Sequence, residues 1–182
     1  MKNILIVVGS FRKGSYNRQL AERVESLLAG RAHVSYLDYG DLPFINQDTE
    51  FPTPASVARV RARLMEADGI WICSPEHNHS IPAVLKNLLD WLSRPMLPDD
   101  PEKRSCARGK AATVSGAGGK SATAYGREAI KTVLDFIGMR VAAGTGTGIA
   151  LSPEAYKSGV LNFSDETLAA LKKQAEEFLA IL

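Results

Sequence analysis

The 182-residue sequence contains only two cysteines, Cys73 and Cys106. A disulfide framework or a cysteine-rich metal site needs more cysteines at closer spacing, so a reducing compartment such as the cytoplasm is expected. No apolar run approaches the ~20 residues of a membrane-spanning helix, and the apolar N-terminal run is shorter than the core of a signal peptide. We therefore expect a cytoplasmic protein with no membrane partner.

An excess of charge of one sign is also absent. The 22 basic and 20 acidic residues are scattered along the sequence and give a net charge of +2. A nucleic-acid partner is not expected, because no basic block is present. Two of the three histidines, His77 and His79, alternate beside a single carboxylate, Glu76. This set is a poor metal site, so no metal is expected.

Two periodicities alternate along the chain, whose length suits one domain spanning residues 1–182. Short apolar runs predict strands, and apolar residues at every third or fourth position predict helices. The predicted strands are 4–8, 32–37, 69–74, 110–115 and a weaker one within 140–143. The predicted helices are 17–29, 55–67, 82–93, 122–137 and a last one capped by Ser164.

This alternation predicts a three-layer α/β sandwich, because parallel strands need crossover connections that place helices on both faces of the sheet. Two strand orders are common. The dinucleotide-binding order favours Gly-x-Gly-x-x-Gly in the first turn, which here has only Gly9 and Gly14. We therefore predict a five-stranded parallel sheet of flavodoxin-like order, 2-1-3-4-5, with a ligand where the first and third strands end, at Gly9 and Ser74.

The predicted third helix has more apolar residues than one buried stripe needs. Leu85, Leu88, Leu89 and Leu92 share one face, and Val84 and Trp91 widen it. We expect this surplus to contact a second copy of the chain, in a homodimer or homotetramer.

The loop at residues 9–17 has the features of a phosphate site. It joins a buried strand to an amphipathic helix, where unpaired N–H groups and the helix dipole favour an anion. Ser10, Arg12, Ser15 and Asn17 can add donors. The order of residues does not match a nucleoside-triphosphate P-loop, and no cysteine nucleophile is present in the loop. A phosphate ester that is bound without hydrolysis is the better interpretation.

Two further loops are predicted at the same sheet edge. Residues 74–82 contain two prolines, whose restricted backbone can present N–H and C=O groups to a flat heterocycle. The alternative interpretation of this segment is a polar surface turn that contains two prolines and binds no ligand. A glycine-rich turn is predicted at residues 116–120, and the small residues of segment 115–119 allow close approach of a ligand. Glu76 could act as a general acid or base, but the sequence has no second carboxylate at a spacing that indicates a catalytic pair.

At these residues the sequence resembles the NAD(P)H-dependent FMN reductase family, which includes bacterial chromate and quinone reductases. The family's Gly-Ser-x-Arg-x-x-Ser-x-Asn signature appears at residues 9–17. Its Pro-Glu-Tyr-Asn-Tyr-Ser-Ile/Val-Pro-Gly-x-Leu-Lys-Asn-x-x-Asp-Trp signature appears at residues 75–91, with His77 and His79 in place of the tyrosines and Ala83 in place of the glycine. A Leu-Pro-x-x-x-x-Asp stretch appears at residues 42–48.

The resemblance implies a bound FMN and a set of residues that contact it. Ser10, Arg12, Ser15 and Asn17 would hold its phosphate. Pro75, Glu76, His77 and Asn78 would contact the isoalloxazine, and Ser115, Gly116 and Gly118 would lie by the other edge of the ring.

The activity implied is hydride transfer from NAD(P)H to the flavin and on to a small acceptor such as a quinone. No catalytic acid–base residue is expected, because the flavin carries out the difficult step. An alternative is an FMN-binding electron carrier or redox-sensing module without physiological reductase turnover. The near-neutral charge favours the enzyme, since a one-electron carrier is usually strongly acidic.

Overall fold

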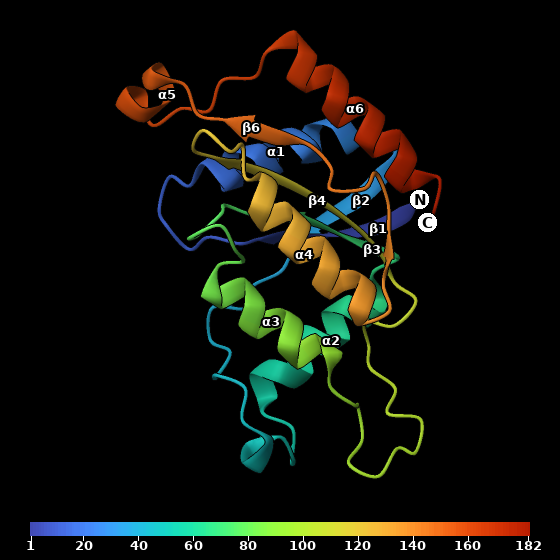
Figure 1. Ribbon diagram of the computed structural model, residues 1–182. Helices are drawn as coiled ribbons and strands as arrows, with labels where there is room; N and C mark the ends of the chain where they lie inside the picture. The colour runs from blue at the N-terminus through green and yellow to red at the C-terminus, as the bar shows by residue number, and fades with distance from the viewer.

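In the computed structural model, which describes residues 1–182, a parallel sheet forms the middle layer (Figure 1). Its main path has the order β2-β1-β3-β4-β5, so the predicted flavodoxin-like order is confirmed. Cys73 of β3 pairs with Val8 of β1 and Ser115 of β4, which places the three central strands in register near their carboxyl ends. The strands are β1 (Lys2–Val8), β2 (Ala32–Tyr36), β3 (Gly69–Cys73), β4 (Ala111–Gly118), β5 (Arg140–Val141) and β6 (Gly148–Ala150).

Helices cover both faces of the sheet, as predicted (Figure 1). Ile4 and Ile6 of β1 pack with α1 (Tyr16–Leu28) and α6 (Asp165–Leu179) on one face. Leu5 and Val7 face the other side, where α2 (Ala55–Glu66), α3 (Ala83–Ser93) and α4 (Ala124–Phe136) pack. A strand buried on both faces must be apolar at every position, which explains the continuous apolar run of β1.

Local signals set the helix ends within one or two residues of the predictions. Ser15 caps α1 by accepting a hydrogen bond from the N–H of Asn17, and Gly30 follows the helix with a φ of +74°. Ser164 caps α6 by accepting from the N–H of Thr167. Each cap satisfies donors that the helix itself leaves unpaired.

The edge beyond β4 differs from the prediction of five strands and a glycine turn. β5 pairs with the start of β4, whereas β6 pairs with Gly116–Gly118 at its end. The expected turn at residues 116–120 is therefore wrong for Gly116–Gly118, which extend β4 because β6 supplies a partner. A short helix α5 (Pro153–Ser158) follows β6, and a 3-10 turn, η1 (Gln47–Thr49), follows β2; neither was predicted.

Gln174 of α6 fills the break between β5 and β6. Its amide nitrogen donates to the carbonyl of Val114 and to Oγ1 of Thr113, both at 2.8 Å. Its oxygen accepts from the Ser115 hydroxyl at 3.1 Å and from the N–H of Thr147 at 2.9 Å. One buried side chain thus replaces the strand pairing that is missing in the middle of β4.

Trp91 does not widen an exposed apolar face, so the prediction that it contributes a surplus for a second copy is wrong. Its side chain is fully buried within the chain, and its indole N–H donates to the carbonyl of Pro43 at 2.8 Å. Val84, the other residue that was expected to widen the apolar face, is 36% exposed.

No helix in the structure has the length and apolar character needed to cross a bilayer.

Candidate functional site

A cavity of about 690 Å³ opens at the carboxyl edge of the sheet, and we call it the first cavity. Its volume lies within the range of about 300–1,000 Å³ that is usual for small-molecule sites. The loops after β1 and β3, the end of β4 and the segment after β6 form its walls. Eight of the eleven predicted cofactor residues line it: Ser10, Arg12, Ser15, Asn17, Pro75, Glu76, His77 and Gly118.

The loop between β1 and α1 offers unpaired donors. The main-chain N–H groups of Ser10, Phe11, Lys13 and Gly14 donate to no acceptor in the protein. They precede the N-terminus of α1, where the helix dipole adds positive potential. This arrangement suits an anion.

Two side chains of this loop complete the donor set. Oγ of Ser15 accepts the capping N–H of Asn17 at 3.2 Å, which leaves its own O–H free to donate. The Arg12 guanidinium folds over the loop, where it donates to the carbonyl of Gly14 at 2.9 Å and lies 5.1 Å from the centre of the Tyr16 ring. Most of its five N–H groups remain available to a ligand.

Asn17 holds the loop between β1 and α1 against the sheet. Its side-chain amide donates to the carbonyl of Ala117 and accepts from the N–H of Ala117, each at 2.9 Å. Both groups are buried. The side chain therefore fixes the position of the start of α1 relative to the end of β4. These two segments are walls of the first cavity, so the distance between the walls is fixed as well.

The loop after β3 forms a small hairpin. His77 and Ser80 exchange two main-chain hydrogen bonds, of 3.1 and 2.9 Å. Asn78 and His79 at its tip have φ values of +50° and +57°, as the central residues of a type I′ turn do. Asn78 therefore lies at the tip and does not line the first cavity.

Glu76 ties this hairpin to the N-terminus of α4. Its side chain is 7% exposed. Its carboxylate accepts from the N–H of Gly126 at 2.8 Å and from the Ser121 hydroxyl at 2.9 Å. A β-carbon on Gly126 would lie 3.1 Å from that of Glu76, so the glycine permits this close approach.

The same contacts determine the ionisation of Glu76. Burial by itself raises the pKa of this carboxyl. The hydrogen bonds from Gly126 and Ser121, with His79 nearby, outweigh burial and hold the pKa below its usual value. Glu76 is therefore an ionised structural anchor at neutral pH, which makes it unsuited to donate a proton.

Ser115 and Gly116 do not reach the first cavity. Oγ of Ser115 accepts from the indole of Trp71 at 3.1 Å and is fully buried in the sheet. A β-carbon on Gly116 would lie 2.2 Å from Oγ1 of Thr123 and 2.5 Å from the carbonyl of Ser74. Both residues therefore support the wall behind Ala117 and Gly118.

Comparison with known proteins decides the family. A model of the NADPH-dependent FMN reductase family matches residues 2–150. An NAD(P)H-dependent FMN reductase of Pseudomonas aeruginosa is 32% identical over 136 residues, which cover 74% of this chain and 70% of that protein. The chain belongs to the NADPH-dependent FMN reductase family.

Two further similarities agree with this family. A 2-hydroxy-1,4-benzoquinone reductase of a Burkholderia species is 42% identical over 92 residues, and the match spans half of each chain. The solved structure of FerB, a flavoenzyme NAD(P)H:(acceptor) oxidoreductase from Paracoccus denitrificans, has a TM-score of 0.84 at 29% identity and covers 99% of this chain and 96% of its own.

Some residues that line the first cavity lie outside the family signatures. Leu151 and Tyr156, on the segment after β6, also line it. The Tyr16 hydroxyl holds this segment by donating to the carbonyl of Ala155 at 2.8 Å. A local signal was present, since Ser152 caps α5 and proline occupies its first turn, but the helix is too short for its periodicity to stand out.

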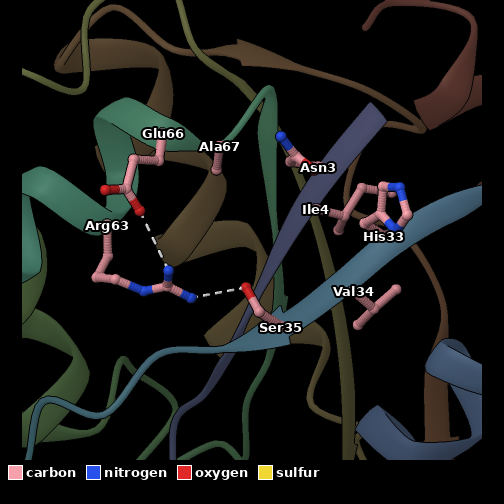
Figure 2. A pocket seen from close by; sticks show the side chains of 8 residues that line it. All are labelled: Asn3, Ile4, His33, Val34, Ser35, Arg63, Glu66 and Ala67. Atoms are coloured by element: carbon pink, nitrogen blue, oxygen red, sulfur yellow. Dashed lines mark hydrogen bonds and ion pairs between the residues drawn. The ribbon is translucent and has the colours of Figure 1, made fainter. Parts of the chain in front are cut away.

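A smaller cavity of about 290 Å³ lies beside the amino-terminal half of β1 (Figure 2). Its one permanently charged cation, Arg63, donates to Oγ of Ser35 at 2.9 Å and pairs with Glu66 at 3.2 Å, as the dashed lines show. Because Glu66 supplies a counter-charge to that guanidinium, the smaller cavity has no permanently charged cation without an ion-pair partner. We assign the candidate site of this family to the first cavity.

Proposed function

We propose that the protein is an FMN-dependent NAD(P)H oxidoreductase that passes hydride from the nicotinamide to the flavin and on to a quinone or similar acceptor. One observation carries the proposal: a single cavity brings together a loop of unpaired N–H groups and a rigid hairpin. Membership of the FMN reductase family supports it.

The donor set fits the FMN phosphate. Ser10, Arg12 and Ser15 would hold the phosphate, together with the free main-chain N–H groups of the loop. Asn17 would hold the loop in place without contacting the phosphate, because its side-chain amide is already bonded to Ala117. A dianion at this site gains charge-assisted hydrogen bonds and the helix dipole together.

The hairpin after β3 suits the flat ring. Pro75 and His77 line the first cavity, and the anchor at Glu76 keeps their main chain in one place. The exposed faces of Phe11 and Tyr156 add apolar area on other walls. When bound, FMN accepts hydride from the nicotinamide and gives it to the acceptor. The residues of the chain bind and orient the reactants.

An electron carrier is the alternative, and turnover separates the two. We expect the protein reconstituted with FMN to oxidise NADPH in the steady state with benzoquinone as acceptor. A carrier would bind FMN and turn over negligibly. Flavin retention without NADPH or NADH oxidation would therefore reject the reductase.

Assembly and location are further proposals. A homodimer or homotetramer is supported by apolar side chains that the chain leaves exposed, among them Phe44 and Phe136. Sedimentation as a single 19.7 kDa species would reject it. A cytoplasmic location is supported by the free, buried thiols of Cys73 and Cys106, and recovery from an oxidising compartment in cell fractionation would reject it.

A further inference from the structure

A second cavity, of about 550 Å³, lies on the other side of the first loop. Most of its lining is formed by residues 10–14, by Arg18 of α1 and by residues 36–39, which begin at the last residue of β2. Ser10, Phe11 and Arg12 line both cavities. The two cavities therefore share one wall, which is the loop assigned to the FMN phosphate.

The lining of the second cavity has more positive than negative side chains. Arg12, Lys13 and Arg18 line it, and none of the three forms an ion pair. Asp38 is the only carboxylate in the lining. Because Arg12 is assigned to the FMN phosphate, Lys13 and Arg18 remain for a second ligand, and the repulsion between these two like charges favours an anion between them.

Aromatic faces accompany these cations. Phe11, which is 53% exposed, packs on the buried ring of Tyr39 at 4.9 Å between ring centres, and the Tyr39 hydroxyl donates to the carbonyl of Val8 at 2.7 Å. The Arg18 guanidinium lies 4.4 Å from the centre of the Tyr36 ring. Aromatic rings and stacked guanidinium groups are surfaces on which nucleobases stack. An anion joined to a flat base is therefore the ligand chemistry that matches this lining.

We propose that the second cavity binds the adenosine phosphate half of the nicotinamide donor. This inference rests on the proposed function. The two cavities share Ser10, Phe11 and Arg12, so a dinucleotide bound in this way would pass over the shared loop to bring its nicotinamide into the first cavity. The Asp38 carboxylate can accept hydrogen bonds from ribose hydroxyls, and Lys13 and Arg18 are the cations that remain for the phosphates.

The test is the substitution Arg18→Ala in the FMN-loaded protein. Arg18 lines the second cavity and not the first, and it belongs to none of the groups assigned to the FMN phosphate. We expect KM for NADPH and NADH to rise about tenfold, because the lost charge-assisted contact weakens binding. KM for reduced nicotinamide mononucleotide, which lacks the adenosine half, stays unchanged, as do kcat and FMN affinity.

A second readout does not depend on turnover. Calorimetric titration with ADP should show binding to the wild-type protein that is about tenfold weaker in Arg18→Ala. The matched control, Arg108→Ala, removes one exposed arginine from outside both cavities and should behave as wild type.

Three results would overturn the inference: an unchanged KM for the dinucleotides, an equal rise in KM for the truncated donor, or an equal effect in the control. None of these three results contradicts the proposed reductase function if reduced nicotinamide mononucleotide still supports turnover. Absence of turnover with every donor in the wild type would instead reject the proposed function, and this inference with it.

Discussion

Replacing Glu76 with glutamine removes a buried charge at the junction of the β3 loop and α4. Two bonds hold the carboxylate, from Gly126 N–H at 2.8 Å and from the Ser121 hydroxyl at 2.9 Å. Glutamine keeps one oxygen for the N–H of Gly126, and its NH₂ group can turn toward Oγ of Ser121. Glu76→Gln therefore preserves the shape of the junction and removes its charge.

The size of the effect follows from these contacts. A hydrogen bond to a charged group contributes about 1.5–3 kcal/mol, against about 0.5–1.5 kcal/mol for a neutral one. The favourable position at the N-terminus of α4 adds about 0.3–1 kcal/mol. We expect Glu76→Gln to lower the free energy of unfolding by about 1–3 kcal/mol at pH 7, and Glu76→Ala by about 2–4 kcal/mol because it leaves both donors without a partner.

The pH dependence has a definite sign. The pKa of Glu76 is lower in the folded protein than its usual value. Its contribution is therefore complete above the unfolded-state pKa of about 4.3 and is lost as pH falls through the folded-state pKa. The difference in stability between the wild type and Glu76→Gln should therefore shrink as pH is lowered from 5, and it should vanish once the pH is below the folded-state pKa of Glu76, where both side chains are neutral.

Urea unfolding across this pH range measures the effect. Glu66→Gln is a matched control, because Glu66 is 66% exposed in its pair with Arg63 and an exposed pair contributes about 0–1 kcal/mol. Equal stability of Glu76→Gln and wild type at pH 7, or a deficit that stays constant down to pH 3, would refute the assignment of Glu76 as an ionised anchor.

Three further substitutions test other parts of the site. Arg12→Ala should weaken FMN binding by about 1.5–3 kcal/mol in a fluorescence titration if its guanidinium contacts the phosphate, and unchanged affinity would contradict that role. Asn17→Ala should lower the free energy of unfolding by about 2–4 kcal/mol in urea, because it leaves both main-chain groups of Ala117 without their partner; a wild-type midpoint would argue against this tie. Gln174→Leu should cost about 2–5 kcal/mol by the same measurement, since the groups that it bonds in β4 stay buried, and a neutral result would mean that water replaces it.

Much of the fold could be predicted from short-range patterns. The apolar run of β1 and the spacing of Leu20, Val24 and Leu28 gave the first strand and helix, because both depend on neighbours within a few positions. The strand order followed from one negative observation, the missing middle glycine of the first turn, where Phe11 stands, combined with the handedness of crossovers.

The remaining features depend on long-range pairing. β6 is three residues long and exists because it pairs with the end of β4, so no periodicity within it could indicate a strand. The carboxylate of Glu76 meets the N–H of Gly126, 50 positions away, and Asn17 meets Ala117, 100 positions away. These contacts show that two residues of the predicted cofactor set have structural partners, which the sequence motif alone does not distinguish from ligand contacts.

The most direct measurement compares the affinity of the purified, flavin-free protein for FMN and for riboflavin, which has the same ring and no phosphate. If the loop of residues 9–17 holds the phosphate, FMN should bind at least about 100-fold more tightly, since two charge-assisted hydrogen bonds contribute about 3 kcal/mol or more. Equal affinity for the two flavins, or failure to bind either, would contradict the assignment of this loop.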